Sequence, residues 1–328
     1  MKSKTITKKI EEDTKPENIK TIDIYIIAGQ SNASGYTKID ESIIKSLWDK
    51  CYVGSKNVIY AGRAESTDNV NTPSVSTIVN EVDWTKARLG QGMSTSHMGA
   101  EVGMAKVLSE EYYTGDRVAG IIKFAHGGTS LTGSQGGENA ANGNWVSPSY
   151  AKFKKLDYSG ITGGLYRGLL AQVEKNISEL EGMGYNQINI KGVFWMQGES
   201  DRDEYGYNYQ TALEYFISDL RGALSEITGI DLSELPFMIG EISRTCTSAD
   251  QDSINLNERF IETQHSVAEK LDKVYIIPSA PYEIVKLDPV TGGEILDPVQ
   301  RDHYHWNTES IFGIGQLVGR CIIDKILN

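Results

Sequence analysis

The sequence predicts an α/β protein, a doubly wound sandwich in which helices cover both faces of a central parallel sheet. Short apolar runs rich in β-branched residues indicate buried strands, and longer segments with apolar residues three and four positions apart indicate amphipathic helices. Strands and helices alternate along the chain, and this order predicts parallel pairing through right-handed crossovers. With 328 residues, 39% of them hydrophobic, the chain is long enough to bury a substantial core.

Five segments are predicted to form the strands of a five-stranded sheet, with helices between and after them. The strands are 22–28, 118–125, 188–196, 236–242 and 273–278. The helices are 98–109, 165–180, 209–227, 256–271 and one that begins near Thr308.

Two stretches, residues 36–97 and 132–164, interrupt this pattern. Both are too long for minimal connections, so they are predicted to be loop insertions that form the walls of a substrate groove. Trp84, Trp145 and Tyr158 lie within them, and such rings can stack on the faces of sugars. The alternative is that each ring anchors its own loop to the core.

Acidic residues outnumber basic ones, with 44 Asp and Glu against 32 Lys and Arg and a net charge of −12. Because nucleic-acid binding depends on clustered Lys and Arg, this balance argues against nucleic acid as a partner. Because the net charge is negative, a neutral or cationic substrate is expected to bind more readily than a polyanion. The cysteines at positions 51, 246 and 321 are too far apart to indicate a disulfide framework or a zinc site.

Neither a membrane-spanning helix nor a signal peptide is predicted from the sequence. No window approaches about 18 consecutive apolar residues, so no membrane-spanning helix is expected. Residues 1–20 are charged and lack the apolar stretch of a signal peptide, and they are predicted to be a flexible arm or linker before a single domain at 21–328. The protein is expected in the cytoplasm if the chain is complete, and outside the cell if a leader has been removed.

Ser31 is the best candidate for a nucleophile in the chain. It follows the first predicted strand directly, and Gly29 allows a sharp turn there. A serine in that place projects from the carboxyl edge of the sheet, where open α/β folds bind ligands and the next helix offers N–H groups to an anion. The alternative is that Ser31 only caps a helix.

Oxyanion donors are predicted at the ends of the second and third strands. Gly127 and Gly128 follow the second strand, where glycines let backbone N–H groups approach a ligand closely; the alternative is a tight turn. Gln197 follows the third strand, and its amide donates a hydrogen bond to an oxyanion without a change in charge.

Two acidic residues, Glu199 and Asp201, come directly after Gln197. The alternative to a catalytic role is a structural one, in which they hold loops by hydrogen bonds to the backbone or to Arg202. For Glu199 the structural role is the preferred one.

A candidate base lies near the C-terminus, just before the last predicted helix. Asp302 stands three residues before His305, so its carboxylate can turn back to accept the Nδ1–H of that histidine. The Nε2 atom is then left to take a proton from a serine. His303 is the competing base, but as the direct neighbour of Asp302 it is less well placed to be oriented by it.

Four motifs together resemble the SGNH hydrolase superfamily, specifically its sialate O-acetylesterase and acetylxylan esterase branch, and are similar to carbohydrate esterase family 6. They are Gly29-Gln30-Ser31-Asn32, Gly127-Gly128-Thr129, Trp195-Met196-Gln197-Gly198-Glu199 and Asp302-His303-Tyr304-His305. Each motif is weak alone, but the four stand in the right order, each at a predicted strand end or before the last helix. The resemblance spans roughly residues 20–325.

The resemblance implies a flavodoxin-like three-layer α/β/α sandwich that hydrolyses acetyl esters of carbohydrates without a metal or other cofactor. It matches Ser31 to the nucleophile, His305 to the base and Asp302 to the acid that orients the base. The implied oxyanion donors are the backbone N–H groups of Ser31 and of Gly127 or Gly128, and the side chain of Gln197. Gln30, Asn32 and Glu199 are the supporting residues of these motifs.

The predicted function is that of a serine esterase acting through an acetyl-enzyme on acetylated xylan or a related plant polysaccharide. Sialic acid is the alternative acetylated sugar, and the acidic balance favours neutral xylan over this anion. A lipase or thioesterase would need an apolar acyl groove, whereas the predicted insertions are polar. The alternative from another class is a carbohydrate-binding module that has lost catalysis.

Overall fold

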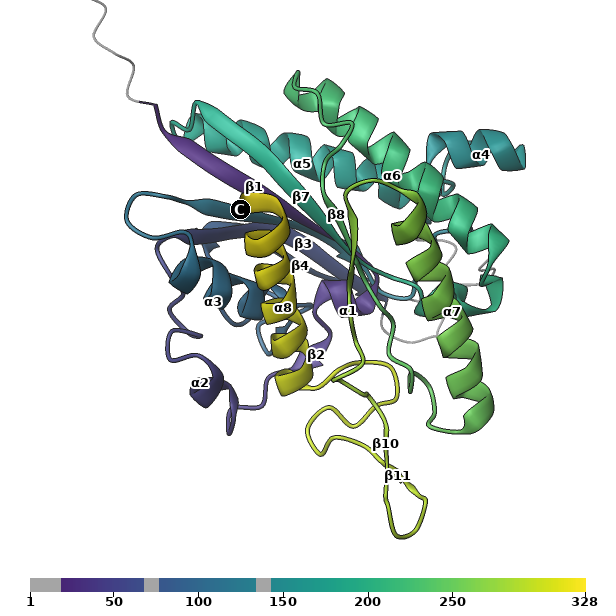
Figure 1. Cartoon of the computed structure of the whole chain (residues 1–328). Helices are drawn as coiled ribbons and strands as arrows, with labels where there is room; N and C mark the ends of the chain where they lie inside the picture. Colours follow the sequence, from purple (N-terminus) through teal and green to yellow (C-terminus); the bar gives the residue numbers. More distant parts are fainter. Residues whose placement is uncertain (1–18, 68–76, 134–142) are drawn as a thin grey trace, which may run out of the picture.

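A computed structural model describes residues 19–67, 77–133 and 143–328, which form a three-layer α/β sandwich (Figure 1). The strands of its sheet are β1 (Thr21–Gly29), β3 (Val58–Thr67), β4 (Thr77–Lys86), β6 (Ala119–His126), β7 (Gln187–Met196), β8 (Phe237–Gly240) and β9 (Val274–Ile277). Within the described ranges these seven strands pair in the order β4-β3-β6-β1-β7-β8-β9. Only the pair of β3 with β4 is antiparallel among them, so the predicted α/β sandwich with a mainly parallel sheet is confirmed.

The five predicted strands are β1, β6, β7, β8 and β9, and all five are present. In space they follow the order second, first, third, fourth and fifth, which is the flavodoxin-like order. The order reverses between β1 and β7, and crevices at such a reversal are where open α/β sheets bind ligands. The carboxyl ends of these two strands therefore mark the place for a site.

The sheet has two strands more than the sequence predicts, and both lie in the stretch 36–97. β3 pairs with β6, and β4 forms the edge beyond it. Neither contains a long apolar run, because Gly62, Arg63 and Glu65 interrupt β3 and polar residues alternate with apolar ones along β4. The prediction of a loop over 36–97 is therefore wrong for Val58–Thr67 and Thr77–Lys86.

Parts of the other sequence predictions fall outside the described residues. These parts are residues 1–18 of the predicted arm, 68–76 of the first insertion and 134–142 of the second. The described part of the second insertion contains a short helix, α4 (Pro148–Lys154). At the other end of the predicted arm, the Lys20 N–H donates to Asn186 Oδ1 at 2.9 Å.

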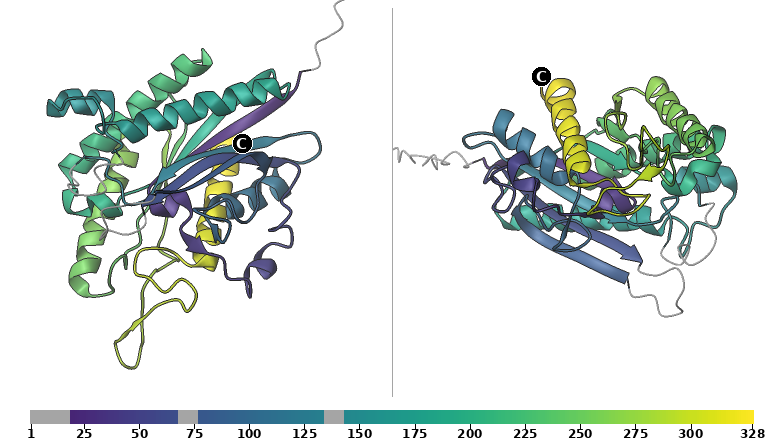
Figure 2. Two further views of the ribbon diagram at one scale, coloured as in Figure 1. Left: turned by 180° about the vertical axis from the view of Figure 1, so that it is seen from behind. Right: turned by 90° about the horizontal axis from the view of Figure 1, so that it is seen from below.

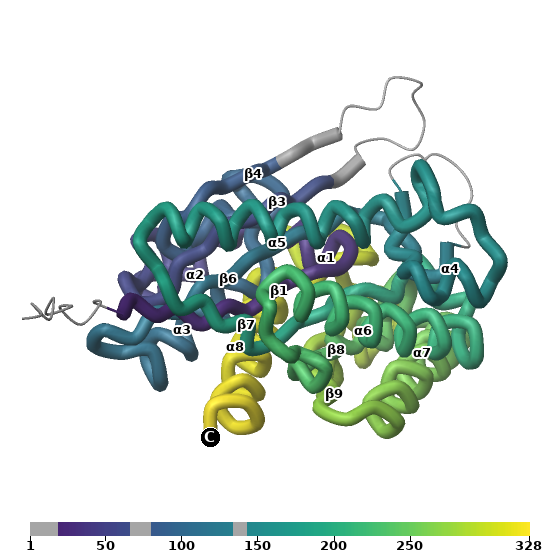
Figure 3. Tube along the Cα trace, turned by 90° about the horizontal axis from the view of Figure 1, so that it is seen from above, coloured from purple at the N-terminus to yellow at the C-terminus, as the bar shows by residue number. Residues whose placement is uncertain are grey.

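Helices cover both faces of the sheet, as Figures 2 and 3 show from three further directions. One face carries α5 (Gly164–Gly182), α6 (Tyr207–Thr228) and α7 (Gln251–Lys270), and the other carries α3 (Glu101–Glu111) and α8 (Thr308–Ile322). Each predicted helix is thus present. α7 begins earlier than predicted because Asp250 caps it, accepting from the Ser253 N–H at 2.9 Å.

The central strand β1 is buried against both helical layers. Ile22, Ile24 and Ile26 face the cluster of apolar residues under α5 and α6, whereas Tyr25 and Ile27 face the cluster under α3 and α8. The apolar run Ile24–Ala28 of β1 follows from this, since a strand covered on both faces has no polar side.

Short elements complete the fold. They are α1 (Ser31–Ser34), β2 (Thr37–Lys38), α2 (Ile44–Leu47), β5 (His97–Met98), a 3-10 helix at Glu199–Glu204, β10 (Lys286–Leu287), β11 (Glu294–Ile295) and a π-helical end at Ile323–Leu327. β2 pairs with β5, and β10 pairs with β11, both antiparallel.

Candidate active site

Ser31 lies at the carboxyl end of the central strand, as the sequence predicts, and begins the single turn of α1. The turn requires Gly29, whose φ is +141° and where a Cβ would lie 2.1 Å from the carbonyl oxygen of Met196. The Gln30 N–H donates to that same oxygen at 3.0 Å. This close approach of β1 to the end of β7 holds Ser31, half-buried, at the point where the strand order reverses.

The two neighbours of Ser31 connect it to the segments that carry the other candidate residues. Gln30 Oε1 accepts from the N–H groups of Gly198 and Ser200 at 3.3 and 3.2 Å. Asn32 Nδ2 donates to Glu199 Oε1 at 2.6 Å and to the carbonyl of Tyr304 at 3.1 Å. The structure thus gives both residues contacts that suit their predicted supporting role.

Glu199 is a half-buried residue beside this turn, and its carboxylate faces inward. Burial raises its pKa, which the Asn32 hydrogen bond and the nearby charge of His305 oppose. Its Oε2 atom and Asn32 Oδ1 are buried without a hydrogen-bond partner in the described part of the chain. The contacts of Glu199 therefore agree with the structural role, since it fastens the segment after β7 to the turn of Ser31.

His305 and Asp302 form a hydrogen-bonded pair ahead of α8. His305 Nδ1 lies 3.1 Å from Asp302 Oδ2, and Gln300 Nε2 donates to the same oxygen at 2.7 Å. Burial alone would raise the pKa of Asp302, but His305, the Tyr304 N–H and Gln300 hold it at about 2. An ionised carboxylate is what an orienting acid requires, because it stabilises the imidazolium that forms when the histidine takes a proton.

The loop that carries His305 is held next to the turn of Ser31 although 274 residues separate them. The ring of Tyr36 stacks on His305 with centroids 4.3 Å apart, and the Tyr36 N–H donates to the carbonyl of Ser31 at 3.2 Å. Thr37 Oγ1 donates to the carbonyl of Trp306 at 2.7 Å. The segment after α1 thus lies against the loop of the candidate base.

His303, the competing base, has different surroundings. Its Nδ1 atom lies 3.7 Å from Glu294 Oε2, and its carbonyl accepts from the Thr247 N–H at 2.7 Å. The carboxylate of Asp302 instead contacts the ring of His305. The geometry therefore favours His305 as the base.

The two glycines after β6 differ in what their N–H groups do. The Gly127 N–H donates to the carbonyl of Glu65 at 2.9 Å and so continues the pairing of β6 with β3. Gly128 has a φ of +67° and is half-buried. The backbone of Gly128 is thus the better placed of the two to offer an N–H group to a ligand.

Gln197 corrects one expectation from the sequence. Its side chain is 1% exposed, and Nε2 donates to the carbonyl of Thr129 at 3.0 Å and to Asp201 Oδ2 at 2.5 Å. Its Oε1 atom accepts from the Tyr209 hydroxyl at 3.0 Å. Because an amide nitrogen has two hydrogens and both are donated within the protein, Gln197 holds the loop after β6 and does not offer a donor to an oxyanion.

The contacts of Asp201 agree with a structural role. It is buried and accepts from Ser130 Oγ at 2.6 Å, the Leu131 N–H at 2.7 Å and the Thr132 N–H at 3.1 Å. Arg202 donates to Thr247 Oγ1 at 2.6 Å, on the segment that also binds the backbone of His303. These contacts fasten two loops of the site to the end of β7.

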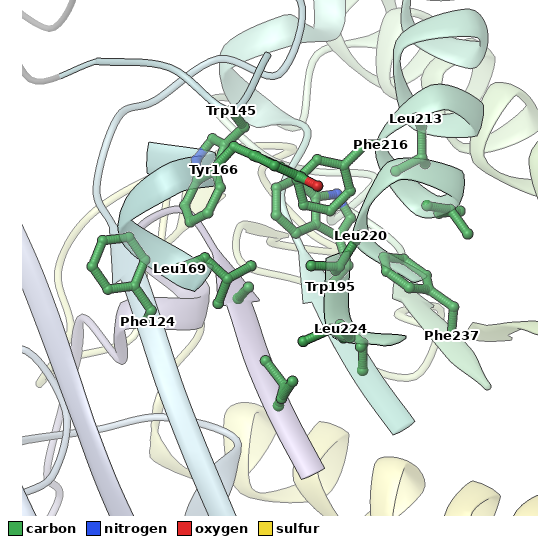
Figure 4. Packing of buried hydrophobic residues seen from close by; sticks show 14 of the residues in the cluster. Phe124, Trp145, Tyr166, Leu169, Trp195, Leu213, Phe216, Leu220, Leu224 and Phe237 are labelled. Atoms are coloured by element: carbon green, nitrogen blue, oxygen red, sulfur yellow. The ribbon is translucent and has the colours of Figure 1, made fainter. Parts of the chain in front are cut away.

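The aromatic residues of the predicted insertions make contacts within the protein. Trp145 is fully buried, packs edge-on against Trp195 with centroids 5.1 Å apart, and donates from Nε1 to Thr129 Oγ1 at 2.8 Å (Figure 4). Trp84 Nε1 donates to the carbonyl of Asn176 at 3.2 Å. Tyr158 packs under the guanidinium of Arg167, 5.1 Å from the ring centroid. Trp145 and Tyr158 therefore anchor their loops, whereas Trp84 lies on strand β4 and packs against the core.

The sequence patterns do not identify Tyr36 or Glu65 of β3 as residues that contact the candidate site. Tyr36 belongs to no motif, and only its position five residues after Ser31 hints at its place. Glu65 contacts His126 Nδ1 at 2.9 Å with Oε2 and pairs with Arg63; its pKa is lowered chiefly by the His126 hydrogen bond. Because β3 was not predicted as a strand, this neighbour of Gly127 could not be anticipated.

In residues 19–67, 77–133 and 143–328, no group of three or more His, Cys, Asp or Glu side chains is arranged to hold a metal ion. Among the helices of the same ranges, none combines the length and apolar character needed to cross a membrane.

Comparisons with known proteins place this site in context. A family model described as carbohydrate esterase, sialic acid-specific acetylesterase, matches residues 21–324. A solved structure of a protein from Arabidopsis thaliana is similar over 93% of this chain and 98% of its own, with 18% identity and a TM-score of 0.55. NanS is similar over 93% of this chain and 97% of its own, with 15% identity and a TM-score of 0.52. At these identities the two structures show a shared fold, and none of the curated proteins compared matches the chain.

Proposed function

The chain belongs to this family of carbohydrate esterases, and from that premise we propose that it removes O-acetyl groups from sugars by a Ser31–His305–Asp302 mechanism. The family makes the protein a carboxylic ester hydrolase that acts on carbohydrate. The observation that carries the mechanism is the pair of His305 and ionised Asp302, held by Tyr36 and Asn32 against the turn of Ser31.

In the first half of the reaction Ser31 is acetylated. His305 Nε2 takes the proton of the Ser31 hydroxyl as its oxygen attacks the acetyl carbonyl, and Asp302 stabilises the resulting imidazolium. The oxyanion of the tetrahedral intermediate accepts from the backbone N–H groups of Ser31 and Gly128. His305 then gives the proton to the sugar oxygen, and the C–O bond to the sugar breaks.

In the second half, water repeats these steps on the acetyl-enzyme. His305 takes a proton from the water as it attacks the acetyl carbon, and the same proton returns to Ser31 as acetate leaves. The donors that hold the oxyanion are again backbone groups, since Gln197 is engaged elsewhere. The supporting residues act by fixing these backbones: Gln197 and Asp201 hold the loop after β6, and Asn32 joins the two halves of the site.

Acetylated xylan is the substrate we favour, because the acidic balance of the chain disfavours an anionic sugar. Arg63 pairs with Glu65 and Glu81, and Arg202 donates to the segment around Thr247. Arg63 is thus neutralised by two carboxylates, and the excess of acidic residues disfavours an anionic sugar. An O-acetylated sialic acid is the second candidate, and the description of the family that matches the chain favours it.

The two substrates are separated by measuring acetate release from acetylated xylan and from O-acetyl sialic acid side by side. The proposal expects faster release from xylan, and Ser31→Ala is expected to release acetate from neither. Faster release from sialic acid would replace xylan by the second candidate. Equal, slow hydrolysis by wild type and Ser31→Ala would contradict the mechanism and leave a carbohydrate-binding protein as the alternative.

A further inference from the structure

Tyr304 has an exposed ring on a backbone that the site holds from both sides. Its N–H donates to Asp302 Oδ1 at 2.9 Å, and its carbonyl accepts from Asn32 Nδ2 at 3.1 Å. The residue is nevertheless 53% exposed. Tyrosine is enriched at binding interfaces, because its ring buries a large apolar area while its hydroxyl stays in water.

The ring of Tyr304 lies next to the proposed base. Its centroid is 6.3 Å from that of His305, and the two planes are inclined at 56°. Tyr36, which stacks on the same histidine, is half-buried. Tyr304 thus presents the more exposed aromatic surface beside His305.

The role of His305 determines which part of the substrate comes near this surface. The imidazolium gives its proton to the oxygen of the leaving group, so the leaving alcohol lies on the histidine side of the scissile ester. In a carbohydrate ester this alcohol is the sugar. A pyranose has C–H groups on its faces and hydroxyls around its edge, so a face packs on an aromatic ring while the hydroxyls stay in water.

We propose that Tyr304 is the platform on which the sugar of the acetyl ester packs, which makes it a residue that determines specificity for the leaving group. The inference rests on the proposed function, since it takes the position of the sugar from the role of His305. The sugar has departed before water attacks the acetyl-enzyme. Tyr304 therefore affects acylation, which kcat/KM reports, and has no part in deacylation.

The experiment compares two esters that form the same acetyl-enzyme with different leaving groups. One is ethyl acetate, and the other is whichever of an acetylated methyl xyloside and O-acetyl sialic acid the wild type hydrolyses faster. Tyr304→Ala is expected to lower kcat/KM for the sugar ester about tenfold, the factor for losing about 55 Å² of apolar contact at about 25 cal/mol per Å². The value for ethyl acetate is expected to stay unchanged. Tyr304→Phe and Tyr304→Trp keep a ring and are expected to keep the preference for sugar.

Tyr112→Ala is the matched control. Tyr112 lies at the opposite end of the sheet, where it lines a hollow with Thr21 and Val118 at the starts of β1 and β6. It is expected to leave both esters unaffected. If Tyr304→Ala lowers kcat/KM equally for both esters, Tyr304 only holds its loop. If it lowers kcat/KM for neither ester, Tyr304 does not contact the sugar. Either result overturns the platform. A wild type that hydrolyses ethyl acetate but no acetylated sugar contradicts the proposed function itself, and the platform with it.

Discussion

Replacing Asp302 by asparagine keeps the size of the side chain and removes its charge. The carboxylate accepts from Gln300 Nε2 at 2.7 Å, from the N–H groups of His305 and Tyr304 at 2.8 and 2.9 Å, and from His305 Nδ1 at 3.1 Å. Although burial opposes ionisation, these donors hold the pKa at about 2. The site is therefore organised around the charged form of this residue.

The effect of Asp302→Asn follows from these contacts. The pKa of Asp302, about 2, lies below the ordinary value of 3.8, and this difference corresponds to about 2 kcal/mol. The variant is expected to lose about 2 kcal/mol of unfolding free energy at neutral pH. The loss of activity is larger, because an asparagine NH₂ facing Nδ1 favours the tautomer of His305 whose Nε2 already carries a proton. In serine proteases the equivalent change lowers kcat by about 10⁴.

The assay is kcat on an acetylated sugar together with unfolding in urea, with Asp297→Asn as the matched control. Asp297 lies in the same loop and accepts from the N–H groups of Val299 and Gln300 at 2.9 and 2.8 Å, but its contacts do not include His305. Asp297→Asn is expected to lose stability and to keep kcat once folded. A folded Asp302→Asn with nearly unchanged kcat, or an equal loss of kcat in both variants, would refute the assignment of Asp302.

Three further predictions concern stability. Gly29→Ala is expected to destabilise the fold by more than about 3 kcal/mol, since its Cβ would meet a carbonyl at 2.1 Å, whereas Gly182→Ala, with open space around the Cβ, is expected to be neutral or stabilising by thermal melting. Gln197→Met is expected to cost about 2 kcal/mol in urea unfolding, because buried acceptors including Asp201 lose a donor; unchanged stability with a large fall in kcat would identify Gln197 as an oxyanion donor after all. The stability difference between wild type and Asp302→Asn is expected above pH 3.8 and to disappear as pH falls through about 2, because the depressed pKa of Asp302 stabilises only the ionised protein; a difference that persists below pH 2 would contradict this.

The strands that the sequence predicts are those buried on both faces. β1 and β7 read as apolar runs because helices cover each side, and their burial is nearly continuous toward the carboxyl end. β4 lies at the edge with polar residues along it, so its pattern is that of a loop as much as of a strand. β3 joins the sheet through partners that are remote in sequence, which no local pattern encodes.

In the site, too, local sequence patterns predict local features but not the contacts between remote segments. The turn of Ser31 and the Asp302–His305 spacing are local features, so the sequence predicts them directly. Gln197 is different: an amide at a strand end suits an oxyanion, but only the fold shows that Asp201 and the carbonyl of Thr129 already take both of its hydrogens. Which acceptors take the hydrogens of Gln197 depends on how the loop after β6 lies against the segment after β7, and the sequence does not show this.

The central claim is that Ser31 carries the acetyl group between the two halves of the reaction. Mass spectrometry of enzyme quenched in acid during turnover of an acetyl ester tests this most directly. The account predicts a mass increase of one acetyl group on the peptide that contains Ser31, and its absence in Ser31→Ala, which also loses turnover. An unmodified Ser31 peptide in an enzyme whose Ser31→Ala variant still turns over the ester would contradict it.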